Sequence, residues 1–231
     1  MSTLLLRLAG PAQSWSGVQL YPSTVQTERV PTRSGVLGLL ACCLGARQGH
    51  WPAWIEDITA WVRVDRPGDV RTDFQTVNGV PDHMESHFAR SAVAENPRAP
   101  KPKIQLAGEA YNLRQRRFLA GAEFILAIEH DRNLSDLTAA VASPAFMPYL
   151  GRKAFAPTFP FVLGVSDLTA TQATEQIPTV PAPPGTAGTA GASTLEVYPL
   201  VSDRNVTHHA VVVPNASRKE QLAWASTHLT R

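Results

Sequence analysis

Residues 3–8 read Thr-Leu-Leu-Leu-Arg-Leu, and the pair Gly10-Pro11 ends this run. A short, leucine-rich segment bounded by such a turn signal is typical of a buried strand. A helix is expected to begin at Pro31-Thr32-Arg33-Ser34-Gly35, where Thr32 or Ser34 can serve as the N-cap. The chain therefore opens with a strand, a long irregular connection and a helix.

Later segments extend this order. Alternating residues at 60–65 and 70–77, separated by the turn Pro67-Gly68-Asp69, predict a hairpin. Residues 122–129 predict a further strand, and a helix that starts near Asn133 and ends at Ser143-Pro144 follows it. The order of elements favours an α+β, ferredoxin-like domain with its helices on one face of the sheet.

The domain organisation follows from composition. We expect a ferredoxin-like domain over residues 1–170, with a long hairpin insertion at about 70–117. The stretch 171–194 is rich in Thr, Ala, Pro and Gly and is expected to be a flexible linker or loop. A smaller C-terminal region of strands and a helix, residues 195–231, completes the chain.

Composition excludes several classes of protein. The chain has 231 residues, of which 44% are hydrophobic, and 21 basic residues nearly balance 19 acidic ones. Apolar runs such as 36–44 are far shorter than the roughly 20 residues of a membrane span, so no membrane association is expected. The start of the chain is not expected to be a signal peptide, and Cys42 and Cys43 are expected to be core residues of an apolar helix. A cytoplasmic location is expected.

The basic residues are unevenly placed. Residues 1–50 hold four Arg against one acidic residue, and residues 98–153 hold nine basic residues against five acidic ones. The intervening stretch 51–97 is acidic. This pattern favours a surface with one basic groove, although an Arg-rich, Lys-poor composition alone is explained equally well by a GC-rich genome.

Three local clusters are candidates for binding RNA phosphates. The helix start at 31–35 offers free backbone N–H groups beside polar side chains, or is simply an ordinary cap. The segment 148–153 offers a ring, a glycine and two cations, which suit base stacking and phosphate binding, or is a surface turn. Arg114-Gln115-Arg116-Arg117 is a solvated face unless it borders the other two clusters.

Enzyme motifs are missing. The sequence has no phosphate-binding glycine-rich loop, dinucleotide fingerprint or nucleophile elbow. His83 and His87 are four residues apart, but they lack the adjacent Glu of a zincin and lie in an irregular, proline-flanked segment. His208 and His209 are adjacent and unsuited to sharing one metal. We therefore expect no catalytic residue, no metal and no cofactor.

Several segments together resemble a known family. They are residues 6–11 with Gln13 and Trp15, then 31–40, then 148–153 with Pro160 and Leu163-Gly164. In order and spacing they are similar to the Cas-five family, the RAMP subunits of CRISPR Cascade complexes, in its subtype I-E form. The resemblance covers residues 3–45 and 118–164 well. It implies a ferredoxin-like RAMP (modified RRM-like) domain, although the aromatic strand motifs of an RRM are missing.

The resemblance also implies a function. It implies a non-catalytic RNA-binding subunit that clamps the 5′ handle of crRNA and caps the backbone filament in antiviral defence. Its partners would be the crRNA, the Cascade backbone subunit and the large PAM-reading subunit, with target DNA reached indirectly. RNA contact carries over to Gln13, Trp15, Thr32, Arg33, Ser34, Tyr149, Gly151, Arg152 and Lys153, and Arg116 and Arg117 join them as the third basic cluster. The insertion after Val70 falls where the family extends a thumb.

One departure bears on catalysis. Subtype I-C relatives cut precursor RNA with a Tyr, Lys and His site, whereas here no Lys neighbours a His. This favours a subunit without nuclease activity. The alternative is a metal-independent endonuclease of CRISPR repeat RNA that uses His50 or His83 as general base. A third reading is an assembly scaffold with little RNA contact of its own.

Overall fold

The computed structural model describes residues 2–16, 24–77, 84, 112–181, 191–201 and 208–230. The chain divides into two compact units. The first unit comprises residues 1–17, 27–71 and 118–231, and the second unit comprises residues 18–26 and 72–117. The first unit holds the main sheet and its helices.

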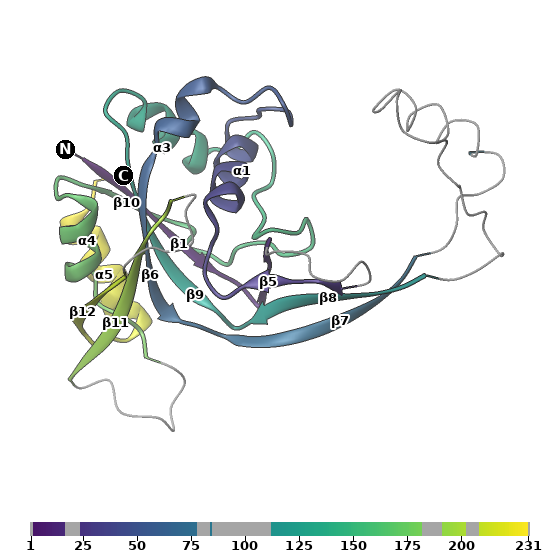
Figure 1. The fold of residues 1–231 in the computed structure, drawn as a ribbon. Helices are drawn as coiled ribbons and strands as arrows, with labels where there is room; N and C mark the ends of the chain where they lie inside the picture. The colour runs from purple at the N-terminus through teal and green to yellow at the C-terminus, as the bar shows by residue number, and fades with distance from the viewer. Residues whose placement is uncertain are drawn as a thin grey trace. The chain divides into compact units, whose positions relative to one another are not determined.

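The main sheet has six strands in the order β10-β1-β9-β6-β11-β12, and every neighbouring pair is antiparallel (Figure 1). The strands are β1 (Thr3–Ala9), β6 (Thr59–Arg66), β9 (Glu123–Glu129), β10 (Val162–Ser166), β11 (Ala192–Pro199) and β12 (His209–Pro214). The strands predicted at 3–8, 60–65 and 122–129 are confirmed. Two helices, α1 (Arg33–Cys43) and α3 (Leu134–Ala142), are interspersed with the main-sheet strands in the order β1-α1-β6-β9-α3-β10. One main-sheet strand precedes α1, two lie between α1 and α3, and β10 follows α3.

Helices cover both faces of this sheet (Figure 1). Leu4, Leu6 and Leu8 of β1 pack in the same cluster as residues of α1 and α3. Leu5 points to the opposite face, where α4 (Ala170–Gln176) and α5 (Arg218–His228) contribute their apolar residues. The two helices expected on one face, α1 and α3, do lie there together, but the cover that α4 and α5 give the other face was not expected. A strand that is apolar at nearly every position buries both of its faces and needs cover on each.

The prediction that residues 60–65 and 70–77 pair as a hairpin is wrong. Both strands exist, as β6 and β7 (Asp69–Val77), and Gly68 turns between them with φ +69°. However, β6 pairs with β9 and β11, whereas β7 pairs with β8 (Asn112–Ala120). Strand β6 is mostly buried and therefore lies inside the main sheet, whereas the side chains of β7 are largely exposed.

Short strands complete the two units. In the first unit, β2 (Ala12–Gln13) pairs with the end of β8, β3 (Trp15–Ser16) pairs with β5 (Thr27–Glu28), and a 3-10 helix, η1 (Ala53–Asp57), precedes β6. In the second unit, β4 (Thr24–Val25) pairs with β8 in parallel. The irregular segment predicted at 80–103, with His83 and His87, lies outside the described residues apart from Met84.

The linker predicted over 171–194 begins as regular structure instead. Residues 170–176 form α4, whose capping box joins Thr169 and Gln172. At the other end of the stretch, residues 192–194 belong to β11, which joins the main sheet next to β6. The sequence missed α4 because its threonines and alanines resemble a linker, while its buried Ala170 and Ala173 fill a narrow space against the sheet. None of the helices in the described part of the chain could cross a membrane.

Several arginines serve the fold itself. Glu123, almost fully buried at 1% side-chain exposure, forms ion pairs with Arg7, Arg66 and Arg218. Burial would raise the pKa of Glu123, but hydrogen bonds and charges from Arg7 and Arg218 outweigh it and lower the pKa. Arg63 is held in the same way by Asp65. These cations are consequently engaged in ion pairs within the fold.

Candidate nucleic-acid interface

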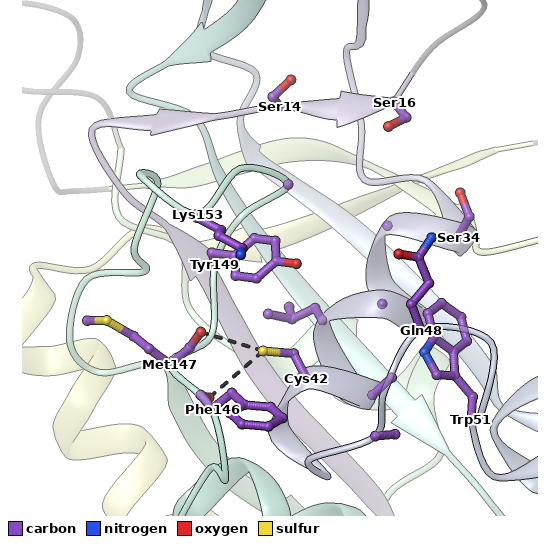
Figure 2. A pocket seen from close by; sticks show the side chains of 16 residues that line it. Ser14, Ser16, Ser34, Cys42, Gln48, Trp51, Phe146, Met147, Tyr149 and Lys153 are labelled. Atoms are coloured by element: carbon purple, nitrogen blue, oxygen red, sulfur yellow. Dashed lines mark hydrogen bonds between the residues drawn. The ribbon is translucent and has the colours of Figure 1, made fainter. Parts of the chain in front are cut away.

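A cleft of about 750 Å³ opens in the first unit between α1 and the segment that follows α3 (Figure 2). Its polar lining comes from Ser14, Ser16, Ser34, Gln48, Tyr149 and Lys153. Its apolar lining includes Cys42, Trp51, Phe146 and Met147, with Gly35, Gly38 and Leu39 of α1 as part of the wall. Two segments that the sequence marked as RNA-binding candidates, 31–35 and 148–153, thus meet at one cavity.

The start of α1 forms one side of this cleft. Thr32 is the N-cap, and its hydroxyl accepts a hydrogen bond from the Gly35 N–H at 3.3 Å. Ser34 is exposed and lines the cleft. Gly35 is required by close packing, since a Cβ there would lie 2.8 Å from the Trp15 ring. The N-terminal end of this helix therefore reaches the cleft with a partial positive charge.

The segment 149–155 forms the opposite side. Its backbone is pinned, because the Leu150 N–H donates to Phe155 O at 2.7 Å and Leu150 O accepts from the Ser14 N–H at 3.0 Å. Gly151 has φ +86°, and a Cβ there would lie 1.6 Å from Ser14 O. Only glycine fits this position. The tight turn holds Tyr149 and Lys153 at the cleft, where both face inward in Figure 2.

Arg152 differs from its neighbours. It is not among the residues that line the cleft, and its guanidinium lies over the Phe155 ring, 5.2 Å from the ring centroid. Phe155 in turn contacts the Phe118 ring at 5.8 Å. Arg152 thus supports the turn through a cation–π contact, and its RNA contact stays a prediction.

The predicted RNA contacts of the Gln13 and Trp15 side chains are wrong. Both are fully buried, with 0% exposure. The Gln13 amide donates to Leu8 O at 3.0 Å and Ala122 O at 2.9 Å, and the Trp15 indole N–H donates to Gln13 Oε1 at 3.2 Å. These two side chains are a buried support behind the cleft, which positions Ser14, Ser16 and Gly35.

Arg33 is likewise committed to the fold. Its guanidinium donates to three backbone carbonyls, Ile58 O and Leu200 O at 3.0 Å each and Glu56 O. The side chain lines a different hollow, together with Ile58 and Leu200, and not the cleft. These contacts give Arg33 a structural role, joining α1 to the end of η1 and the end of β11, and it is not among the residues that line the cleft.

The two cysteines occupy different environments. Cys43 is buried, and burial raises the pKa of its thiol to about 12. Cys42 lines the cleft, so its assignment to the core is wrong. Burial raises the pKa of Cys42 as well, against the opposing charge of Lys153, and the protonated thiol donates to Met147 O at 3.5 Å (Figure 2). It is therefore a hydrogen-bond donor in the cleft wall.

Sequence reasoning missed half of the cleft. Gln48 and Trp51 follow α1 in an irregular segment, and Phe146 and Met147 follow α3 with exposed fractions of 54% and 76%. For Phe146 and Met147 the available signal was a pair of large apolar residues in an irregular segment, where exposed side chains of this kind have no core to fill.

The remaining candidates are not among the residues that line the cleft. Arg116 and Arg117 belong to β8 in the second unit, where Arg116 is opposite Val25. His50 is exposed, and its ring nitrogen Nδ1 is 3.4 Å from Gln48 O. His208 stacks on Tyr198 and lies 3.8 Å from Glu196. Within the residues that the structure describes, no three His, Cys, Asp or Glu side chains gather as a metal site.

The cleft combines the groups that single-stranded RNA requires. Hydroxyls, a helix N-terminus and one ammonium suit phosphate oxygens. Tyr149 and Trp51 offer rings for base stacking.

Comparison with known proteins identifies the family. The family model described as "CRISPR-associated protein (Cas_Cas5)" matches residues 3–221. The chain belongs to this family. The resemblance inferred from residues 6–15, 31–40 and 148–164 is thereby confirmed.

Individual relatives agree with this assignment. The chain is 34% identical over 180 residues to the Escherichia coli (strain K12) protein "CRISPR system Cascade subunit CasD", with 74% of each chain covered. A chain of the solved structure "CRISPR RNA-guided surveillance complex" matches with a TM-score of 0.67 and 25% identity, over 98% of this chain and 100% of that one. A second, "Crystal structure of Cas protein", matches with a TM-score of 0.57 and 25% identity over 93% and 98%.

Proposed function

We propose that this Cas5-family chain is a non-catalytic, RNA-binding subunit of a type I-E Cascade complex, in which it clamps the 5′ handle of crRNA. The observation that carries the proposal is the cleft, because it unites the start of α1 with the 149–153 turn. The relationship to a Cascade subunit of Escherichia coli supports the same assignment. The order β1-α1-β6-β9-α3-β10 supports a ferredoxin-like RAMP domain.

Within this proposal, Ser34 and the first N–H groups of α1 hold one phosphate, and Lys153 and the Gly151 backbone hold another. Tyr149 stacks on a base. The buried pair Gln13 and Trp15 and the carbonyl-bound Arg33 keep both sides of the cleft in place. The backbone subunit and the large PAM-reading subunit are the proposed protein partners, and Arg116, Arg117 and Arg152 are proposed further RNA contacts.

The test is co-purification. The chain is expressed with a repeat-spacer RNA and its neighbouring operon proteins, and the complex is isolated by size-exclusion chromatography. We expect RNA with one uniform 5′ end to co-elute with the wild-type chain. The double variant Tyr149→Ala, Lys153→Ala should fold normally and retain much less RNA, whereas Lys219→Ala, an exposed lysine of α5, serves as the control.

Two results would contradict the proposal. One is full RNA occupancy in the double variant. The other is cleavage of repeat RNA by the isolated chain in EDTA, which would establish a metal-independent endonuclease instead.

A further inference from the structure

The two ends of the cleft differ in chemistry. In Figure 2 the hydroxyls of Ser14, Ser16 and Ser34 lie toward the top, and Trp51 and Phe146 lie toward the bottom. Phosphate oxygens require donors, whereas a nucleobase requires an apolar slot with an aromatic wall. The cleft therefore has one end suited to phosphate and one end suited to a base.

Gln48 stands at the boundary between these ends. Its side chain lines the cleft across from Tyr149 (Figure 2). Within the described part of the chain, the side-chain amide of Gln48 forms no hydrogen bond. The His50 ring contacts the backbone carbonyl of Gln48 and not its side chain. A carboxamide offers a donor and an acceptor side by side, which is the pattern that pairs with the edge of a base.

Gly38 sets the position of the Trp51 ring. A Cβ at Gly38 would be in ordinary van der Waals contact with this ring, at 3.8 Å, so the indole lies against this part of α1. The missing side chain at position 38 lets the indole approach the helix closely, and Trp51 forms an aromatic part of the cleft wall.

We infer that the Trp51 end of the cleft is a nucleobase subsite, in which one unstacked base of a single-stranded RNA lies beside Trp51 and Gln48 reads its edge. The inference rests on the proposed function, since it assumes that RNA enters the cleft. It adds sequence selectivity at one nucleotide to phosphate binding by Ser34 and Lys153. Gln48 and Trp51 are then specificity determinants, whereas Lys153 acts on any sequence.

The experiment compares labelled octaribonucleotides rA8, rU8 and rC8 by fluorescence anisotropy with the full chain. In the wild type we expect the strongest and weakest binders to differ by at least about fivefold, the lower end of what a paired base edge contributes. Gln48→Ala should reduce this ratio to below about twofold. Gln176→Ala, an exposed glutamine at the end of α4, should leave the ratio unchanged.

A second variant tests the slot itself. Gly38→Leu places a bulky side chain against the Trp51 ring, which must then move, and the melting temperature of the variant verifies that the fold is retained. We expect it to abolish the base preference while phosphate-dependent binding persists. Lys153→Ala should instead weaken all three RNAs equally.

The possible results distinguish failure of the nucleobase subsite from failure of the proposed RNA clamp. A wild-type chain that binds the three RNAs equally, or a preference that survives both Gln48→Ala and Gly38→Leu, overturns the nucleobase subsite and leaves the proposed RNA clamp intact. A wild-type chain that binds none of them, or a Lys153→Ala variant that binds all of them normally, overturns the proposed clamp and with it the subsite.

Discussion

The segments 31–35 and 148–153 look alike in sequence, because each combines a cation, a small residue and a helix start or turn. In the structure the two segments differ in how many of their residues line the cleft. In the first segment the Arg33 guanidinium donates hydrogen bonds to three backbone carbonyls, and of residues 31–35 only Ser34 and Gly35 line the cleft. In the second segment Tyr149, Gly151 and Lys153 all line the cleft.

The difference shows what competes with RNA for a cation. The ends of η1 and β11 leave carbonyl groups that need donors, and a guanidinium with five N–H groups satisfies several at once. Within the described part of the chain, the Lys153 ammonium forms no hydrogen bond to a carbonyl. A basic residue therefore becomes a candidate for RNA binding only after the donors required by the fold have been assigned.

The largest expected effect concerns an arginine network that the fold uses completely. Glu123→Gln leaves Arg7, Arg66 and Arg218 without their shared carboxylate, and we expect the free energy of unfolding at neutral pH to fall by about 3–5 kcal/mol. Urea denaturation measures this loss.

The same network predicts a pH dependence. Because folding lowers the pKa of Glu123, its stabilisation is complete above the ordinary pKa of a glutamate and is lost as the pH falls through the lowered value. The stability difference between wild type and Glu123→Gln should therefore shrink in acid. A constant difference from neutral pH to strongly acidic conditions would show that the charge of Glu123 does not carry the effect.

Gly151→Ala tests the pinned turn. The new Cβ would collide with Ser14 O at 1.6 Å in a backbone conformation of φ +86°, so the turn must move. We expect a loss of about 3 kcal/mol in stability together with weaker RNA binding. Gly121→Ala is the matched control, since φ there is +67° and nothing lies within 4 Å. Equal losses in the two variants would mean that conformation alone, and not contact with Ser14, requires glycine.

Arg33→Ala separates the two segments most clearly. Removing three charged hydrogen bonds should lower the free energy of unfolding by about 2 kcal/mol, while RNA affinity per folded molecule changes little. Arg132→Ala, on an exposed turn, provides the comparison. A stable Arg33→Ala protein with severely impaired RNA binding would restore the original assignment of Arg33 as a phosphate contact.

The smallest effects on stability belong to Tyr149 and Lys153. Tyr149→Ala should lower RNA affinity by at least about fivefold, the lower end of a stacking contribution. Lys153→Ala should flatten the dependence of log affinity on log salt by about 0.7, the value for one phosphate contact to a single strand. Neither should change the urea midpoint, which is measured alongside. Unaltered affinity and salt dependence in both variants would remove this turn from the RNA site.

Local patterns predicted most of the fold. The leucine run of β1, the cap at Thr32 and the alternation in β6 and β7 each identified their element. Pairing was less accessible, because whether β6 joins β7 or β9 depends on which strand is buried on both faces. Helix α4 was missed because small residues fit both a linker and a narrow space against a sheet.

The site was predictable in position but less so in its residues. The segments 31–35 and 148–153 could be recognised from composition, and they do meet at one cleft. That Gln13 and Trp15 are buried, and that Arg33 faces carbonyls, depends on contacts with residues such as Ala122 and Leu200, more than 100 positions away along the chain. No local pattern encodes such contacts.

The central claim, that the cleft between α1 and the 149–153 turn holds RNA, is tested most directly by photo-crosslinking. The intact complex is assembled on crRNA that carries 4-thiouridine in its repeat-derived 5′ segment, irradiated, and digested for mass spectrometry of RNA-linked peptides. The account predicts crosslinks in peptides that contain Tyr149, Lys153 or Trp51. Crosslinks confined to other surfaces, such as α5 or β12, with none at the cleft, would contradict it.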